Sequence, residues 1–159
     1  NPTPAAAAGG AEAKLHVFNT YNRVLFCAAS LDNTSSWTYS TATWRSLDNS
    51  TTNRISYIDG LGELNINANF LGVILQTAGL YNFGINRDST SAQPTTATVQ
   101  QLTSNNSNFL NQIFIASLGY HYLQAMEVSR DSTSVTVYGN NAVVSGTGQC
   151  ESLSATMSL

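Results

Sequence analysis

The chain has 159 residues, a formal net charge of -3 and 9% charged residues, whereas a soluble domain usually carries about a quarter. Ser, Thr and Asn make up about a third of the sequence, so hydroxyl and amide groups must wet its surface. The few arginines form no basic stripe, which excludes nucleic-acid binding, and no apolar run reaches the roughly 18 residues of a membrane span, which excludes membrane insertion.

The N-terminal segment 1–14, NPTPAAAAGGAEAK, is rich in Ala, Pro and Gly and has no periodicity that could pack. This composition predicts a flexible linker that joins the domain to something upstream. Residues 15–159 have a length that suits one domain with a sizeable core, so we expect a single domain there.

Short runs of β-branched and aromatic residues follow one another from Leu15 onward. The clearest is 63–70, ELNINANF, in which apolar residues alternate with Glu and Asn, as in a half-buried strand. The other runs are 15–30, 35–48, 54–58, 72–78, 80–86, 112–118, 120–129, 134–139 and 152–159. A helix is an alternative at 107–118, but the Asn, Ser and β-branched content favours a loop and then a strand. The pattern predicts an all-β antiparallel sandwich or jelly roll of eight to ten strands, with 88–108 as its longest loop.

The pair Asp59-Gly60, followed by Gly62, stands between two of these runs and predicts a β-hairpin, since glycine supplies the positive φ that a tight connection needs. Asp59 and Glu63 alone are too few for a calcium loop. A hairpin tip also seldom flanks the cleft that a pair of glycosidase carboxylates requires. A tip that contacts a ligand stays open as the alternative.

For the other residues that could bind a ligand or react, the sequence favours structural roles. His16 and His121 have no acidic or cysteine partner at ligand spacing, and Cys27 lies in an apolar run that predicts a buried free thiol, with a Cys27–Cys150 bridge as the alternative. Trp37 and Tyr39, together with Trp44, are a candidate sugar-stacking platform. No nucleophile, phosphate-binding or metalloprotease motif occurs. The sequence therefore predicts a protein that is not an enzyme and that has no metal site and no cofactor.

Four stretches resemble known families. AGLYNFGIN, residues 78–86, resembles the G-x-Y-x-F core strand of C1q and tumour-necrosis-factor-like jelly rolls. ISYIDGLGE (55–63), GYHYLQAMEVS (119–129) and VTVYG (135–139) look like segments of bacteriophage virion proteins of this fold type. The resemblance spans roughly residues 15–159, and the chain departs from the C1q pattern because it has no collagen repeat.

The resemblance implies a jelly-roll homotrimer that serves as a head fibre, spike or capsid decoration domain on the virion surface, outside the cell. The linker would join it to other capsid or tail proteins, and exposed loops at 32–36, 48–53, 86–96 and 139–148 would contact a host receptor or surface polysaccharide. A monomeric carbohydrate-binding module or adhesin domain of a larger protein is the alternative.

Two sets of residues follow as candidates. The residues expected to contact a receptor or ligand are Trp37, Tyr39, Asp59, Glu63, Asn86, Arg87 and Asp88. The residues expected at a trimer seam, for each of which core packing is the alternative, are Tyr81, Phe83, Phe114, Tyr120, Tyr122 and Met157.

Overall fold

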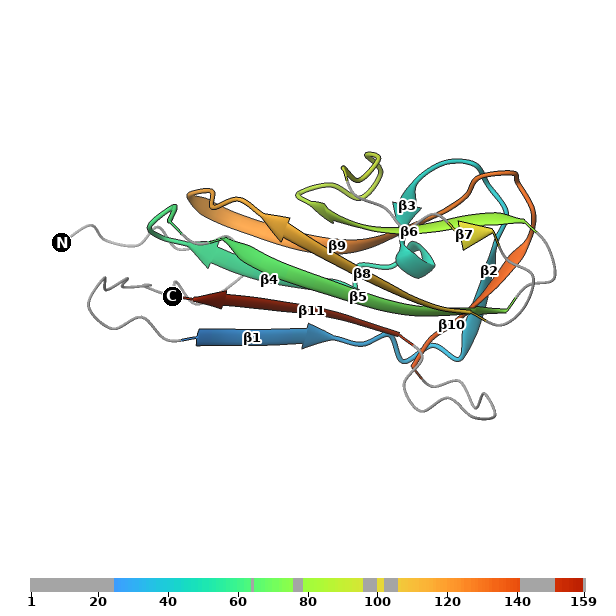
Figure 1. Cartoon of the computed structure of the whole chain (residues 1–159), viewed down its shortest axis with the longest axis horizontal. Coiled ribbons are helices and arrows are strands. Elements are labelled where there is room, and N and C mark those ends of the chain that lie inside the picture. The colour runs from blue at the N-terminus through green and yellow to red at the C-terminus, as the bar shows by residue number, and fades with distance from the viewer. Residues whose placement is uncertain are drawn as a thin grey trace, which may run out of the picture.

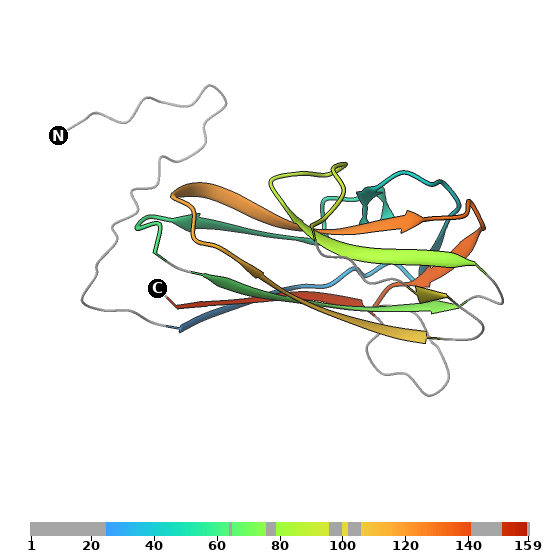
Figure 2. The same cartoon turned by 45° about the horizontal axis from the view of Figure 1, so that its top comes forward.

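Two antiparallel β-sheets stack face to face in the computed structural model, which describes residues 25–63, 65–75, 79–95, 100–101, 106–140 and 151–158 (Figures 1 and 2). The predicted all-β antiparallel sandwich is confirmed. The described residues form eleven strands rather than eight to ten, because two of the eleven are only two residues long. Their single helical element is the 3-10 turn η1, Leu47–Asn49, so no helix of this part of the chain could cross a membrane.

Sheet A is centred on the long strand β5, Ile66–Leu75. One edge of β5 pairs with β8, and the other edge is shared end to end by β11 and β10, which pair in turn with β1 and β2. The bounds of these five strands are β1 Leu25–Ser30, β2 Ser36–Tyr39, β8 Asn106–Phe114, β10 Val135–Tyr138 and β11 Glu151–Ser158. No strand among the described residues pairs with the outer edge of β8, which therefore ends the sheet.

Sheet B is centred on β9, Gly119–Ser129. One edge of β9 pairs with β6, which carries β7 beyond it, and the other edge is shared by β4 and β3. The bounds of these four strands are β3 Arg45–Ser46, β4 Arg54–Asp59, β6 Leu80–Arg87 and β7 Gln100–Gln101. In Figure 2 the strands β4, β6 and β9 form one layer above β1, β5 and β11.

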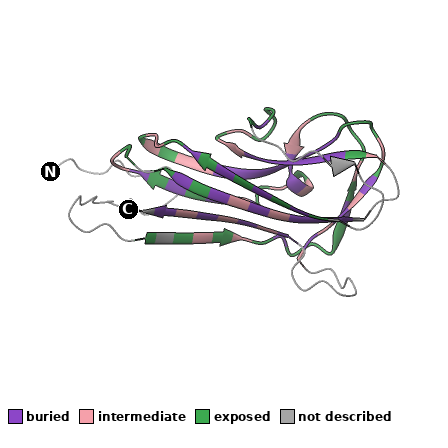
Figure 3. Ribbon diagram, in the orientation of Figure 1, coloured by how far each residue is buried: buried purple, intermediate pink, exposed green. Residues whose placement is uncertain are grey.

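The core lies between the sheets: buried and exposed residues alternate along strands such as β4 and β5, as the banding in Figure 3 shows, whereas β6 and β9 have continuous buried runs. Phe70 of sheet A meets Phe83 of sheet B with 5.1 Å between ring centroids. A Cβ at Gly72 would lie 2.8 Å from the Phe70 ring and 3.1 Å from the Phe83 ring, so only glycine lets the two rings meet there.

The predicted hairpin at 54–70 is wrong, although its turn exists. β4 pairs with β9 in sheet B, whereas β5 lies in sheet A, so the turn carries the chain from one sheet to the other. The Asp59 carboxylate accepts backbone hydrogen bonds from Leu61 and Gly62 at 3.0 and 2.7 Å, and Gly62 has φ +65°. The turn could be predicted from the sequence, but the strand that pairs with β4 could not.

Three further expectations need correction. The run 35–48 is not one strand, because β2 ends at Tyr39 in sheet A and β3 begins at Arg45 in sheet B. The loop at 88–108 is interrupted by β7 and ends where β8 begins, and 106–114 is a strand, as preferred over a helix. Cys27 is an exposed free thiol on the outer side of β1 rather than a buried one. Three predictions fall outside the described residues: the linker at 1–14, the part of the predicted strand run 15–30 that precedes residue 25, and any bridge to Cys150.

Candidate functional site

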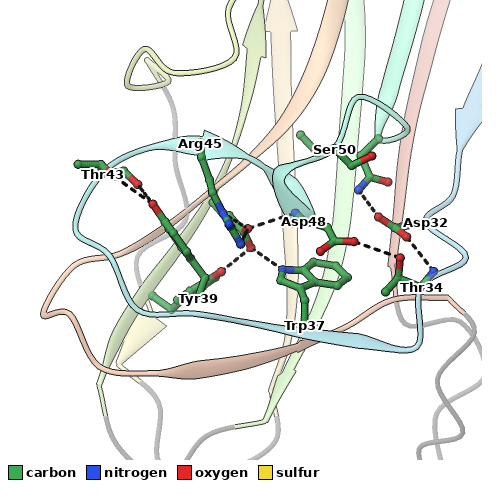
Figure 4. Close-up of polar contacts among 12 residues, drawn as sticks. Asp32, Thr34, Trp37, Tyr39, Thr43, Arg45, Asp48 and Ser50 are labelled. Atoms are coloured by element: carbon green, nitrogen blue, oxygen red, sulfur yellow. Dashed lines mark hydrogen bonds and ion pairs between the residues drawn. The ribbon is translucent and has the colours of Figure 1, made fainter.

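A buried carboxylate ties the strands together at the end of the sandwich that holds β2 and β3 (Figure 4). Glu127 of β9 is fully buried, and its Oε2 accepts hydrogen bonds from the Trp37 indole at 2.9 Å and from the Tyr81 hydroxyl. Its Oε1 accepts from the Arg45 guanidinium at 2.7 Å and from the backbone N–H of Asp48 at 3.1 Å. Segments from both sheets thus converge on one side chain.

Every lone-pair direction of this carboxylate is used by the protein itself. Burial raises the pKa of Glu127, while the bonds from Tyr81, Trp37 and Arg45 act in the opposite direction. Burial, and then the neighbouring Glu127 charge, raise the pKa of the Tyr81 hydroxyl well above its ordinary value. A carboxylate that is fully buried and accepts from four residues cannot reach a substrate, so we assign Glu127 a structural role.

The candidate sugar platform is taken up by the same network. Trp37 is 9% exposed and points its ring into the core, so its faces are not offered to a pyranose. Tyr39 is half-buried, with the Arg45 guanidinium 3.7 Å from its ring centroid, and its hydroxyl donates to the Thr43 carbonyl at 2.7 Å. Trp44 is also half-buried. Trp37 and Tyr39 of β2 instead hold this strand against sheet B, through Glu127 of β9 and Arg45 of β3.

Three of the predicted recognition loops meet around Asp32. Its Oδ2 accepts from the Asn53 amide at 2.8 Å, its backbone N–H donates to Glu151 Oε2 at 2.7 Å, and its carbonyl accepts from the Asn140 N–H at 2.7 Å. Asp32 and Glu151 are 3% and 0% exposed. Burial and the nearby Asp32 charge raise the pKa of Glu151 to about 7, although the Asp32 N–H opposes them. In the part of the chain that the structure describes, no three His, Cys, Asp or Glu side chains are arranged to hold a metal ion.

The predicted contact residues 86–88 make hydrogen bonds within their own loop and to the segments beside it. The Asn86 amide donates to the Ala92 carbonyl at 2.8 Å, and Arg87 donates to the Ile115 carbonyl at 2.6 Å. Asp88, at φ +59°, accepts from the Tyr122 N–H at 3.0 Å and lies 2.6 Å from His121 Nδ1. The partner of His121 escaped sequence analysis because 33 residues separate the two and only the β6–β9 pairing joins them.

The remaining predicted residues divide between core and surface. Asp59 is 4% exposed, whereas Glu63 is exposed. The seam candidates that form part of the core of this single chain are Tyr81, Phe83, Phe114 and Met157. Tyr120 is 63% exposed, and half-buried Tyr122 lies under the Arg54 guanidinium at 4.0 Å from its ring centroid. For the four buried residues, the structure places core packing where the seam was expected.

A surface that sequence analysis did not single out lies on the outer side of sheet A. The six strands of this sheet contain one charged residue, Glu151, and that residue faces inward. At the β8 edge, Phe109 and Ile113 are 66% and 63% exposed, and Ile115 and Leu118 just beyond are 76% and 69% exposed. In this segment apolar residues occupy both odd and even positions, so the sequence alone could not show which of them point outward.

No protein-family model matches this chain, and no curated protein matches it either.

Proposed function

We propose that this chain is a non-enzymatic structural and adhesive head domain of a phage surface protein, a fibre, spike or capsid decoration. It assembles as a homotrimer of jelly-roll subunits, and its loops contact host receptors or glycans. The N-terminal segment joins it to other virion proteins outside the cell.

One observation carries the assembly part of the proposal, namely the exposed apolar side chains of β8, on an uncharged sheet face, and of the segment just beyond this strand. Four large apolar side chains between residues 109 and 118 are each more than 60% exposed. Large exposed apolar side chains gathered in one segment favour an interaction site. An edge strand with no charged residue and no proline is also a template for pairing with another chain, which proteins normally avoid or cover.

The geometry of the carboxylates supports a role without catalysis. The Glu127 carboxylate is buried and accepts from Trp37, the Asp59 carboxylate accepts backbone bonds within its turn, and the Asp32 carboxylate accepts from the Asn53 amide. A rigid sandwich fastened by such ties suits mechanical work on a particle surface.

Light scattering on the purified chain tests the proposal. We expect a mass three times the 17.0 kDa of one chain. A mass of one chain at all concentrations would overturn the trimer and would move the assignment to the monomeric carbohydrate-binding module. Calorimetric titration against a panel of neutral and acidic oligosaccharides would then identify that module.

The adhesive part has its own test. Shortening the loop at 89–95 should abolish adsorption of the purified domain to host cells without changing its mass or its melting temperature. Asp88 is kept, because it ties β6 to β9. Unchanged adsorption would remove this loop from the receptor-binding surface and leave a decoration role.

A further inference from the structure

We propose that the side chains of Asp32, Asn53 and Glu151 form a proton-operated latch, which holds three predicted recognition loops together while Glu151 carries a proton and releases them when Glu151 ionises. These loops begin at residues 32, 48 and 139. Because the proposed function assigns these loops to recognition, the inference rests on that function, and it adds to it a control of the loops by pH.

The latch joins segments that are far apart in the sequence. Asp32 lies between β1 and β2, Asn53 directly precedes β4, and Glu151 is the first residue of β11. The Asn53 amide donates to Asp32 Oδ2 at 2.8 Å, and the Asp32 N–H donates to Glu151 Oε2 at 2.7 Å. Asp32 Oδ1 accepts from the Thr34 N–H at 2.8 Å (Figure 4), and the Asp32 carbonyl accepts from the Asn140 N–H at 2.7 Å. One buried residue thus connects all of these segments.

The buried cluster has more acceptors than donors. Glu151 and Asn53 are fully buried, yet Glu151 Oε1 and Asn53 Oδ1 have no hydrogen-bond partner within the described part of the chain. Buried acceptors without a donor are rare in folded proteins because they lose their bonds to water. A proton on Glu151 Oε1 turns one of these two acceptors into a donor and removes a buried negative charge.

The surroundings of Glu151 supply no positive charge to balance a carboxylate. Burial raises its pKa most, the bond from the Asp32 N–H lowers it, and the Asp32 charge raises it, which gives a pKa of about 7. The groups that face it from the neighbouring segments are the neutral Asn53 amide and, across the strand pairing, Gly72 of β5. The next carboxyl group, Asp48, has the same sign as Asp32 and interacts with it. The neutral acid is therefore the favoured form inside the cluster.

A proton suits this cluster better than a metal ion. Asp32, Asn53 and Glu151 are 3%, 0% and 0% exposed, so a hydrated ion has no access to their unpaired oxygens. A cation such as Ca²⁺ also takes about six to eight oxygen ligands, far more than the two unpaired oxygens of this cluster. A proton needs neither an access path of that width nor a coordination shell.

The pH decides whether the latch is closed. When Glu151 ionises, a second negative charge stands beside Asp32 in a buried place, and water reaches it only if the loops separate. The pKa of Glu151 is about 7 in the closed cluster and 4.5 ordinarily. The closed form is therefore fully stabilised below about pH 4.5, and this stabilisation is lost as the pH rises through about 7. The difference corresponds to a change on the order of 100-fold in the ratio of open to closed loops.

Hydrogen exchange at the backbone N–H groups of Asp32 and Asn140 measures this opening, because both donate within the cluster. After correction for the intrinsic effect of pH on exchange, their protection should fall on the order of 100-fold between about pH 4.5 and about pH 8. The Asp88 N–H, which donates to the Tyr122 carbonyl at 3.0 Å, is the internal reference and should keep its protection. An equal fall at Asp88 would show global unfolding and would overturn a local latch.

Glu151→Gln is the decisive variant, because its amide N–H stands where the protonated acid has its O–H. Protection at Asp32 and Asn140 should then be high and independent of pH. Glu63→Gln, which removes an exposed carboxylate, is the matched control and should behave as the wild type. Protection that is constant with pH in the wild type, or that falls equally in Glu151→Gln, would overturn the latch. Recovery of the protection at pH 8 on addition of calcium chloride would assign the cluster to a cation and would also overturn it.

Adsorption to host cells separates the latch from the proposed function. The wild-type domain should adsorb more strongly at about pH 5 than at about pH 8, whereas Glu151→Gln should adsorb equally at both. Exchange that depends on pH, together with no adsorption at any pH, would keep the latch and overturn the recognition role of the loops. Adsorption without any effect of pH on exchange would keep the proposed function and overturn the latch.

Discussion

The two sheets of this sandwich differ in how many charged residues their strands contain. The four described arginines all lie in sheet B or directly after it, in β3, β4, β6 and the turn beyond β9. Three of them stack on or approach aromatic rings, at 3.7, 4.0 and 5.9 Å from the ring centroids. Sheet A holds one charged residue in six strands, and that residue is buried.

Under the proposed self-association, this difference separates stability from assembly. Sheet B is fastened by charge-assisted hydrogen bonds, such as those of Arg45 to Glu127 and of Arg54 to Gln124. Sheet A leaves amide, hydroxyl and apolar groups facing outward, where contact with another copy would complete their surroundings. The comparison predicts that substitutions in the ties of sheet B lower stability, and that substitutions on the outer face of sheet A alter assembly.

The largest effect should come from Glu127→Ala. It would leave the Arg45 guanidinium, the Trp37 indole N–H and the Tyr81 hydroxyl without their acceptor. Removing one partner of a buried ion pair costs about 3–5 kcal/mol, so we expect a loss of that size in the free energy of unfolding. Urea denaturation at fixed protein concentration measures it. Glu127→Gln keeps one acceptor oxygen and should lose clearly less; equal losses would contradict a role through hydrogen bonding.

The next effect tests the single charge of sheet A. The pKa of Glu151 is about 7 in the folded chain and about 4.5 when exposed, so the folded state binds the extra proton between these values. The contribution of Glu151 to stability should therefore be fully present below about pH 4.5 and be lost as the pH rises through about 7. The total from this residue is on the order of 3 kcal/mol.

Glu151→Gln should remove this component of the pH dependence and raise the melting temperature at pH 8. Subtracting the two stability profiles cancels the contributions of Glu127, Asp48 and other titrating groups. A parallel pair of profiles between pH 4.5 and 8 would show that Glu151 does not titrate there.

A smaller effect is expected from Arg54→Ala in sheet B. Arg54 Nε donates to Gln124 Oε1 at 3.0 Å, and the guanidinium covers the Tyr122 ring. Gln124 is fully buried, so its oxygen would lose its donor, at a cost of about 1–2 kcal/mol. The shift of the urea midpoint measures the loss. Arg54→Lys, which keeps the charge but not the planar group, should recover part of it, and an unchanged midpoint in Arg54→Ala would contradict the stacking role.

Sequence analysis could reach the fold class because alternation is a local property. The alternation in 63–70 indicated which residues of that strand are buried, and Asp59 and Gly62 correctly predicted a turn. Strand pairing is not local, so the β4 partner was misassigned and the contact between His121 and Asp88 was not seen.

The site was harder to predict for a related reason. A buried aromatic such as Tyr81 or Phe83 has the same sequence pattern whether a sheet or another subunit covers it. In β8 the apolar residues occupy both faces, so alternation could not show that Phe109 and Ile113 point outward. Their exposure follows from the register of β8 on β5, which turns Leu110 and Phe114 toward the core and Phe109 and Ile113 toward the outer face of sheet A.

The smallest effect on unfolding should come from Asn111→Ala on the outer face of sheet A. Asn111 Nδ2 donates to Asn67 Oδ1 and Asn69 Oδ1 at 2.5 and 2.6 Å, but all three groups can turn to water, so the loss should stay within about 0.5 kcal/mol. Asn53→Ala is the matched control, because its fully buried amide donates to Asp32 and should cost about 1–3 kcal/mol. If Asn111→Ala costs as much as Asn53→Ala in urea denaturation, the amide row stabilises the single chain, and the division of labour between the two sheets fails.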